Sequence, residues 1–284
     1  MAIFKAACVQ MRSGRDVAAN IAAAETLIRE AAGNGALYIQ TPEMTNLLER
    51  SREALQAKIA DEAGDPSLAR FRALARELGI HLHIGSLAIR LPDGGVANRG
   101  FLIGPDGAIR ARYDKIHMFD VDLANGESWR ESATYRPGTE AVVADLPDMR
   151  MGMAICYDMR FAHLFRAEAK AGAGLITTPA AFTRQTGEAH WHVLTRARAI
   201  ETGSYLVAAA QGGTHEDGRE TYGHSLIIDP WGRVLAEAGT EPGIVIAEID
   251  PAEVEAARGR IPALKNDRAF REPRAPEDAL RTAS

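Results

Sequence analysis

The feature that most constrains the fold is a series of sequence signals that occurs twice in the same order. One helix-to-strand passage ends in Thr41-Pro42-Glu43, and a second ends in Thr178-Pro179-Ala180. Each is followed by a pair of apolar strands around a Pro/Gly turn, at residues 101–109 and 226–235. We therefore expect two similar α/β halves whose sheets pack face to face, because neither sheet could bury both of its faces alone.

Local signals in the first half favour the α/β class. Residues 2–11 form an apolar run that predicts a buried strand, and helical spacing of apolar residues begins at Asp16. Asp65-Pro66 predicts the start of a further helix, which ends at Gly79. The alternative to a repeated half is that glycine and proline turns recur in any α/β protein, so the duplication stays open on these signals.

Composition narrows the class of protein. The chain has 284 residues, of which 46% are hydrophobic and 25% charged, enough apolar content for a large core. The net charge of −5 makes nucleic-acid binding a poor expectation, and the longest apolar runs are far shorter than the roughly 20 residues needed to span a membrane. We expect one domain over residues 1–271 and a mobile tail over 272–284.

The amino terminus and the cysteine count bear on the compartment. The chain runs from Met1 into an apolar strand without the ordered regions of a secretory signal, so we expect a cytoplasmic protein. Its two cysteines, Cys8 and Cys156, cannot supply a disulfide framework or a four-cysteine zinc site. Each cysteine must therefore be judged by its own position.

Cys156 lies where an apolar strand over residues 150–155 passes into a helix. A nucleophile is often presented at such a turn, and amide groups at the start of a helix can lower a thiol pKa and bind an oxyanion. The alternative is a packed core cysteine, which is the interpretation we keep for Cys8 in the middle of its strand.

A cysteine nucleophile needs a base, and the sequence alone leaves two kinds of partner open. One of the eight histidines could serve in a Cys-His arrangement. Glu43 at a strand end and Lys115 after the first hairpin are the other pair, although each taken singly would be an ordinary surface charge. The pair His190 and His192 has no third ligand at a plausible spacing, so no metal site is predicted.

Four parts of the sequence carry a family resemblance: Glu43 and the segments 113–122, 152–161 and 190–201. Together they resemble the nitrilase superfamily of carbon-nitrogen hydrolases. Within it, the segments 205–213 and 222–232 are most similar to the Nit branch, the amidases of deaminated glutathione and of ω-amides of α-keto acids. The resemblance implies an α/β fold, a four-layer α-β-β-α sandwich with two pseudo-symmetric halves. One departure is Thr41, where the family usually has an apolar or aromatic residue.

The resemblance also implies a reaction without metal or organic cofactor. Glu43 would be the base, Cys156 the nucleophile, and Lys115 the support for the oxyanion together with the backbone N–H of Tyr157. Glu131 would orient Lys115, because a buried ammonium needs a charged partner. The expected reaction is hydrolysis of a small carboxylated amide through a thioester, with release of ammonia.

Substrate recognition is less constrained. Arg160 is the candidate for the substrate carboxylate, and a salt bridge with Asp158 or with a partner chain is its alternative. Thr178 and Phe182 are expected to face the same crevice, although packing alone would also explain Phe182.

Other functions stay open at this stage. Within the family, nitriles, N-carbamyl amino acids and aliphatic amides are alternative substrates. A redox or Cys-His enzyme, and a non-catalytic protein that acts through protein contacts, are alternatives of other classes. A small-molecule amide is the expected partner, and the second half, including the helix after Cys156, is expected to form a homodimer face.

Overall fold

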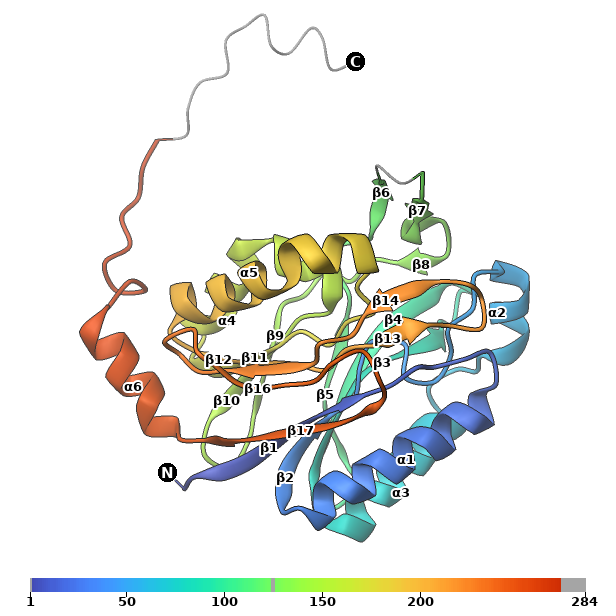
Figure 1. The fold of residues 1–284 in the computed structure, drawn as a ribbon, viewed down its shortest axis with the longest axis horizontal. Coiled ribbons are helices and arrows are strands. Elements are labelled where there is room, and N and C mark those ends of the chain that lie inside the picture. Colours follow the sequence, from blue (N-terminus) through green and yellow to red (C-terminus); the bar gives the residue numbers. More distant parts are fainter. Residues whose placement is uncertain (1, 124–125, 272–284) are drawn as a thin grey trace, which may run out of the picture.

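The computed structural model describes residues 2–123 and 126–271, and two large mixed sheets lie face to face at its centre (Figure 1). The first sheet has the order β17-β1-β2-β3-β4-β5 with β8 beside β4, and the second has the order β16-β15-β12-β11-β10-β9. The strands of the first sheet are β1 (Phe4–Gln10), β2 (Ala36–Gln40), β3 (His81–Arg90), β4 (Val96–Ile103), β5 (Ile109–Asp114), β8 (Tyr135–Arg136) and β17 (Gly243–Ile249). Those of the second are β9 (Val142–Asp145), β10 (Arg150–Met153), β11 (Ala173–Thr177), β12 (Tyr205–Ala208), β15 (Leu226–Ile228) and β16 (Val234–Glu237).

Helices cover the outer face of each sheet (Figure 1). α1 (Val17–Gly33) and α3 (Pro66–Leu78) pack on the first sheet, and α4 (Ala162–Lys170) and α5 (Arg184–Thr202) pack on the second. The four-layer α-β-β-α sandwich is therefore confirmed. The remaining elements are α2 (Arg52–Lys58), α6 (Pro251–Arg260), the short 3-10 helices at Glu131–Ala133 and Cys156–Arg160, and the two small hairpins β6 (Asp120–Asp122) with β7 (Ser128–Arg130) and β13 (Gly212–Thr214) with β14 (Glu220–Tyr222).

The two halves repeat the same topology. Three parallel strands, β1-β2-β3 in one half and β10-β11-β12 in the other, continue into an antiparallel pair, β4-β5 or β15-β16. Lys5 pairs with Ala36 and Arg150 pairs with Ala173, and the same register shift follows each pairing. This equivalence confirms the pseudo-symmetric halves.

Capping residues explain where the helices begin. The Asp16 side chain accepts a hydrogen bond from the Ala19 N–H at the start of α1, and Asp65 does the same for the Leu68 N–H before Pro66 in α3. Both predicted starts are confirmed. The sequence analysis missed α2, a helix of only seven residues, and both small hairpins.

A buried apolar cluster fills the space between the sheets. It combines side chains of both halves, among them Ala6 and Leu102 from the first sheet and Leu206 from the second. Cys8 belongs to this cluster, is fully buried, and lies with its Sγ 3.6 Å from the carbonyl oxygen of Leu226. Burial raises the pKa of the Cys8 thiol far above its ordinary value, so its interpretation as a packing residue is confirmed.

The ends of β2 and β11 meet at Gly85, and this contact fixes the backbone that carries Glu43. A Cβ atom at Gly85 would lie 2.2 Å from the carbonyl oxygen of Thr41 and 2.5 Å from Cβ of Pro179, so only glycine fits there. The Gln211 side chain, from the second half, donates a hydrogen bond of 3.0 Å to the carbonyl oxygen of Glu43. The position of Glu43 therefore depends on both halves.

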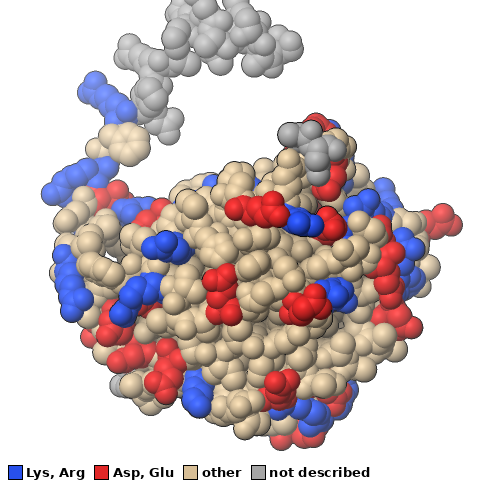
Figure 2. All heavy atoms as spheres, viewed as in Figure 1, with Lys and Arg blue, Asp and Glu red and all other residues tan. Residues whose placement is uncertain are grey.

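Charged side chains of both signs are mixed on one face of the molecule. Lys and Arg side chains are interspersed with Asp and Glu over the face shown in Figure 2. None of the helices within 2–123 and 126–271 is long and apolar enough to cross a membrane. The tail expected at 272–284 lies outside the described residues, and the limits of the single domain stay a prediction.

Candidate active site

A cavity of about 580 Å³ lies at the carboxyl ends of the central strands. Glu43, Lys115, Cys156, Tyr157 and Phe182 line it, as the sequence analysis expected, and so does Glu131. A space of this size can take a small organic molecule. Residues from both halves of the chain therefore converge on one hollow.

Cys156 begins the 3-10 helix that follows β10, in a conformation that few non-glycine residues adopt. Its φ is +49°, and its N–H donates a hydrogen bond of 2.9 Å to the carbonyl oxygen of Pro179. The buried Asp158 carboxylate holds the turn, because it accepts hydrogen bonds from the Ile155 N–H (2.9 Å) and the Tyr113 hydroxyl (2.7 Å). Such a held turn is typical of a nucleophile that is presented to a cavity.

Glu43 is almost fully buried, with both carboxylate oxygens occupied. Oε1 accepts hydrogen bonds of 2.9 Å from Nζ of Lys115 and from Nδ2 of Asn98, and Oε2 accepts one of 2.8 Å from the Ala181 N–H. Cys156 lines the same cavity as this carboxylate, and the carboxylate contributes to the raised pKa of its thiol. The candidate base and nucleophile are therefore neighbours in one cavity.

Lys115 is clamped between two carboxylates. Only 2% of its side chain is exposed, and its Nζ lies 2.9 Å from Oε1 of Glu43 and 2.8 Å from Oε2 of Glu131. Glu131 is held in turn by the Phe119 N–H (2.7 Å) and by Asn98 (3.2 Å). The geometry that was expected between Glu131 and Lys115 is present.

The carboxylates and the ammonium set each other's protonation. Burial alone would lower the pKa of Lys115, but Glu131 and Glu43 raise it well above its usual value, so it stays charged. Burial alone would raise the pKa of Glu43, but the Lys115 ammonium lowers it below its ordinary value. The pKa of Glu131 is raised, by burial and by the neighbouring Glu43.

The expectation that the start of the helix lowers the pKa of Cys156 is wrong. Burial, followed by the Glu43 carboxylate, raises the pKa of this thiol well above its ordinary value. The resting pair at neutral pH is therefore a thiol beside a carboxylate. A base in direct contact is needed to take the proton during attack.

Two expected substrate contacts do not line the cavity. Arg160 lies beside the cavity, with its guanidinium 5.5 Å and 5.8 Å from the ring centres of Phe182 and Tyr157, two residues of the lining. Its Nη2 lies 3.3 Å from Nδ1 of His190, and no Asp158–Arg160 bridge occurs in the described structure. Thr178 is fully buried behind the cavity wall. Phe182 does line the cavity, and its ring also packs against Trp191 at 5.2 Å.

Sequence reasoning missed a group of cationic residues in the cavity wall. The guanidinium groups of Arg219 and Arg50 lie 4.7 and 4.8 Å from the ring centre of Trp129, and all three residues line the cavity. Only 15% of the Arg219 side chain is exposed, and its Nε has no hydrogen-bond partner among the described residues. No local motif marks these arginines, since they lie far apart in the chain.

Asn98 was also missed, although a signal for it exists. It is a fully buried amide within the apolar strand β4, and it bridges Glu43 and Glu131. A buried polar residue inside an apolar run needs a partner, and here the partners are the two carboxylates.

The histidines that the structure describes do not line the cavity. One of them, His192, belongs to a cluster of possible metal ligands. His117 bonds Asp158 through Nδ1 at 2.7 Å, away from the thiol. His192 does have two potential co-ligands, His224 and Glu237, which are distant in sequence. The pair His190 and His192 does not share a ligand cluster, and the cluster around His192 is one that sequence spacing could not reveal.

Comparison with known proteins agrees with this geometry. The family model described as carbon-nitrogen hydrolase matches residues 5–259. A deaminated glutathione amidase of Yersinia enterocolitica is 38% identical over 92% of this chain and 92% of its own, and the omega-amidase of Homo sapiens is 35% identical over 94% and 96%. The crystal structure of the Caenorhabditis elegans NitFhit protein superposes with a TM-score of 0.88 at 35% identity, covering 94% of this chain and 66% of that one. The chain belongs to the carbon-nitrogen hydrolase family and is a hydrolase of non-peptide C–N bonds.

Proposed function

We propose that this protein is an amidase that hydrolyses a small carboxylated amide, either deaminated glutathione or the ω-amide of an α-keto acid, through a thioester on Cys156. The observation that carries the proposal is the convergence of Cys156, Glu43 and Lys115 on one cavity. The names of the relatives, deaminated glutathione amidase and omega-amidase, support the substrate class.

In the first step Glu43 accepts the thiol proton while the sulfur of Cys156 attacks the amide carbonyl carbon. The carbonyl π electrons move to oxygen, and the Lys115 ammonium and the Tyr157 N–H stabilise the oxyanion. Because the thiol pKa is raised and the Glu43 pKa is lowered, proton transfer and attack occur together and no free thiolate accumulates.

In the second step the tetrahedral intermediate collapses and the C–N bond breaks. Glu43 returns its proton to the leaving nitrogen, which departs as ammonia from a primary amide or as an amine from a substituted amide such as deaminated glutathione. Ammonia is therefore the product expected only for the ω-amides. Glu43 then activates a water that hydrolyses the thioester, giving the carboxylic acid and restoring the thiol.

Arg219 and Arg50 are the proposed partners of the substrate carboxylate, in place of Arg160. Both line the cavity, and the unpartnered Nε of Arg219 can donate to an anion. A carboxylate there would also gain from the partly buried setting, where charge-assisted hydrogen bonds are stronger than in water.

The alternatives of other classes have less support. No histidine lines the cavity in the part of the chain that the structure describes, which disfavours a Cys-His enzyme. The paired carboxylates and the ammonium would have no role in a non-catalytic protein. Nitriles, N-carbamyl amino acids and aliphatic amides remain alternative substrates, because all of them suit the same three residues.

The test is an amide panel with matched cysteine variants. The panel contains deaminated glutathione, α-ketoglutaramate, succinamate and an N-carbamyl amino acid, and the acid product is measured because the leaving group differs. Cys156→Ala should remove nearly all turnover, while Cys8→Ala should retain it. Substantial hydrolysis by Cys156→Ala would refute the thioester, and a flat response to all four compounds would refute the substrate class.

We also propose that two copies associate around the carboxyl end of α5 and the turn between β15 and β16, away from His192 and Glu237. Two large apolar side chains are exposed there, Ile200 on α5 and Trp231 on the turn. Sedimentation of the wild type and of Ile200→Glu would test this, since the variant should shift toward the monomer.

A further inference from the structure

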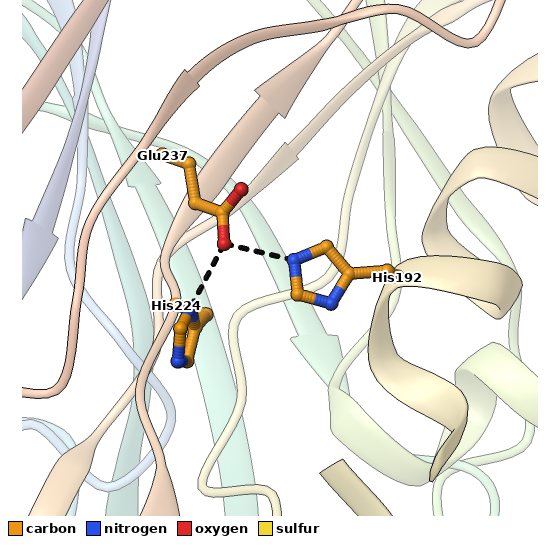
Figure 3. Close-up of side chains that lie close together, drawn as sticks. All are labelled: His192, His224 and Glu237. Carbon is orange, nitrogen blue, oxygen red and sulfur yellow. Dashed lines mark hydrogen bonds and ion pairs between the residues drawn. The ribbon is translucent and has the colours of Figure 1, made fainter. Parts of the chain in front are cut away.

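Three side chains with metal-binding atoms converge on the outer face of the second half (Figure 3). Oε1 of Glu237 lies 2.8 Å from Nε2 of His192 and 2.8 Å from Nδ1 of His224. The three ligand atoms all lie within 4.8 Å of one another. They come from three separate elements, α5, the loop before β15, and β16.

The surrounding structure holds these groups in place. The ring of Tyr222 stacks on His224 at 4.3 Å and meets His192 edge-on at 6.0 Å, so one aromatic ring orients both imidazoles. The Trp191 indole N–H donates a hydrogen bond of 2.8 Å to the carbonyl oxygen of His224. His224 itself has a φ of +54°, an uncommon conformation for a residue with a side chain.

We propose that His192, His224 and Glu237 form a binding site for a divalent transition metal ion of the Zn²⁺ type. Two imidazoles and one carboxylate are a ligand set that Zn²⁺ uses when a fourth position is left to water. The partial exposure of all three side chains leaves that fourth position accessible to solvent. Neither Cys156 nor any other residue of the catalytic cavity takes part.

Metal binding requires side-chain movements at all three residues. Metal–ligand bonds of about 2.0–2.1 Å in a tetrahedron put ligand atoms about 3.3 Å apart. The carboxylate would therefore move outward by about half an ångström from each imidazole, and the two imidazole nitrogens, which lie within 4.8 Å of each other, would close to the same separation. In the metal-free arrangement these nitrogens donate to Glu237. Each of these nitrogens must therefore be free of its proton when the metal binds.

The test measures metal binding directly. Full-length protein stripped with a chelator is titrated calorimetrically with Zn²⁺, and separately with Co²⁺, whose visible absorption reports tetrahedral coordination. Both titrations are repeated on Cys156→Ala, because a zinc ion could also bind the cavity thiol. Melting temperatures with and without Zn²⁺ give a further measurement.

The variants are chosen to separate ligands from bystanders. His192→Asn, His224→Asn and Glu237→Gln should each weaken Zn²⁺ binding at least 100-fold, since even loss of a residue that only supports a ligand costs 10- to 100-fold. His190→Asn is the matched control, because His190 is exposed on the same helix but lies outside the group. Circular dichroism of each metal-free variant establishes that it is folded.

The outcomes are distinct. One ion per chain in Cys156→Ala, retained by His190→Asn and lost in the three ligand variants, supports the site. Absence of Zn²⁺ binding in Cys156→Ala would overturn it and leave the three side chains as a hydrogen-bonded link between α5 and β16. Binding that survives each ligand substitution would overturn it equally.

Discussion

Glu131→Gln tests whether the second carboxylate acts through Lys115. Glu131 accepts two hydrogen bonds from the ammonium, at 2.9 and 2.8 Å, and one from the Phe119 N–H at 2.7 Å. Glutamine keeps the size of the side chain but has one acceptor oxygen, so its amide N–H₂ must face a donor. Lys115 then depends on Glu43 alone, the carboxylate that must also take the thiol proton.

The expected loss of kcat follows from the burial of the ion pair between Lys115 and Glu131. Breaking a buried ion pair costs about 3–5 kcal/mol, and the remaining bond to Glu43 points to the lower end of this range. If about 3 kcal/mol is expressed as lost support of the oxyanion, kcat falls about 100-fold, since 1.36 kcal/mol corresponds to a factor of ten. KM should change much less, because the substrate carboxylate is proposed to bind at the arginines.

The assay is steady-state hydrolysis of the best amide from the panel, with melting temperature measured alongside. Glu62→Gln is the matched control, because it removes a carboxylate that pairs with Arg99 and Arg112 outside the cavity. We expect the control to lose some stability and to keep its kcat. A kcat for Glu131→Gln within threefold of wild type, in a folded protein, would refute the positioning role.

Three further predictions concern recognition, pH and stability. Arg219→Gln should raise KM for a carboxylated amide about 10- to 100-fold and leave an uncharged aliphatic amide unaffected, because hydrogen bonds to charged groups contribute about 1.5–3 kcal/mol; equal losses for both substrates would argue against the anion contact. The pKa of Glu43 is lowered from 4.5, so kcat/KM should stay level down to about pH 4.5 and fall only below it as the base is protonated, whereas a decline centred near pH 6–7 would point to a histidine base. Burial lowers the pKa of His83 from 6.5 to about 3. Between these pH values the unfolded state binds one proton more than the folded state. The free energy of unfolding should therefore fall by about 1.4 kcal/mol for each pH unit below 6.5. Denaturant unfolding of His83→Gln should show a shallower dependence over that range, and an unchanged slope would exclude His83 as the source.

Much of the fold could be predicted because its signals are local. A few adjacent residues mark each of these boundaries. Asp65-Pro66 and Gly79 mark the two ends of α3, and Pro42 and Pro179 mark the strand ends. The 3-10 turn at Cys156 was located for the same reason. The seven-residue α2 has too few turns to give a clear apolar period, which explains why it was missed.

The candidate site was predictable only in part. The proposed roles of Glu43, Lys115 and Glu131 rest on family resemblance, while their contacts follow from the way the halves pack. Arg219 and Arg50 meet at Trp129 only in three dimensions, so no spacing could reveal them. The prediction for the pKa of Cys156 was wrong because the sequence around it shows only that a turn occurs there. Its burial beside the Glu43 carboxylate depends on the three-dimensional fold.

Because the two halves share one register, each catalytic position in one half has an equivalent position in the other. Counting on from the equivalent residues Lys5 and Arg150 puts Met11 in the place of Cys156, and counting on from Ala36 and Ala173 puts Ala180 in the place of Glu43. A thioether cannot give up a proton and a methyl group cannot take one. The equivalent position in the other half therefore has no catalytic chemistry. One half supplies the acid-base group, and the other supplies the sulfur. Neither half separated from its counterpart could carry out the reaction.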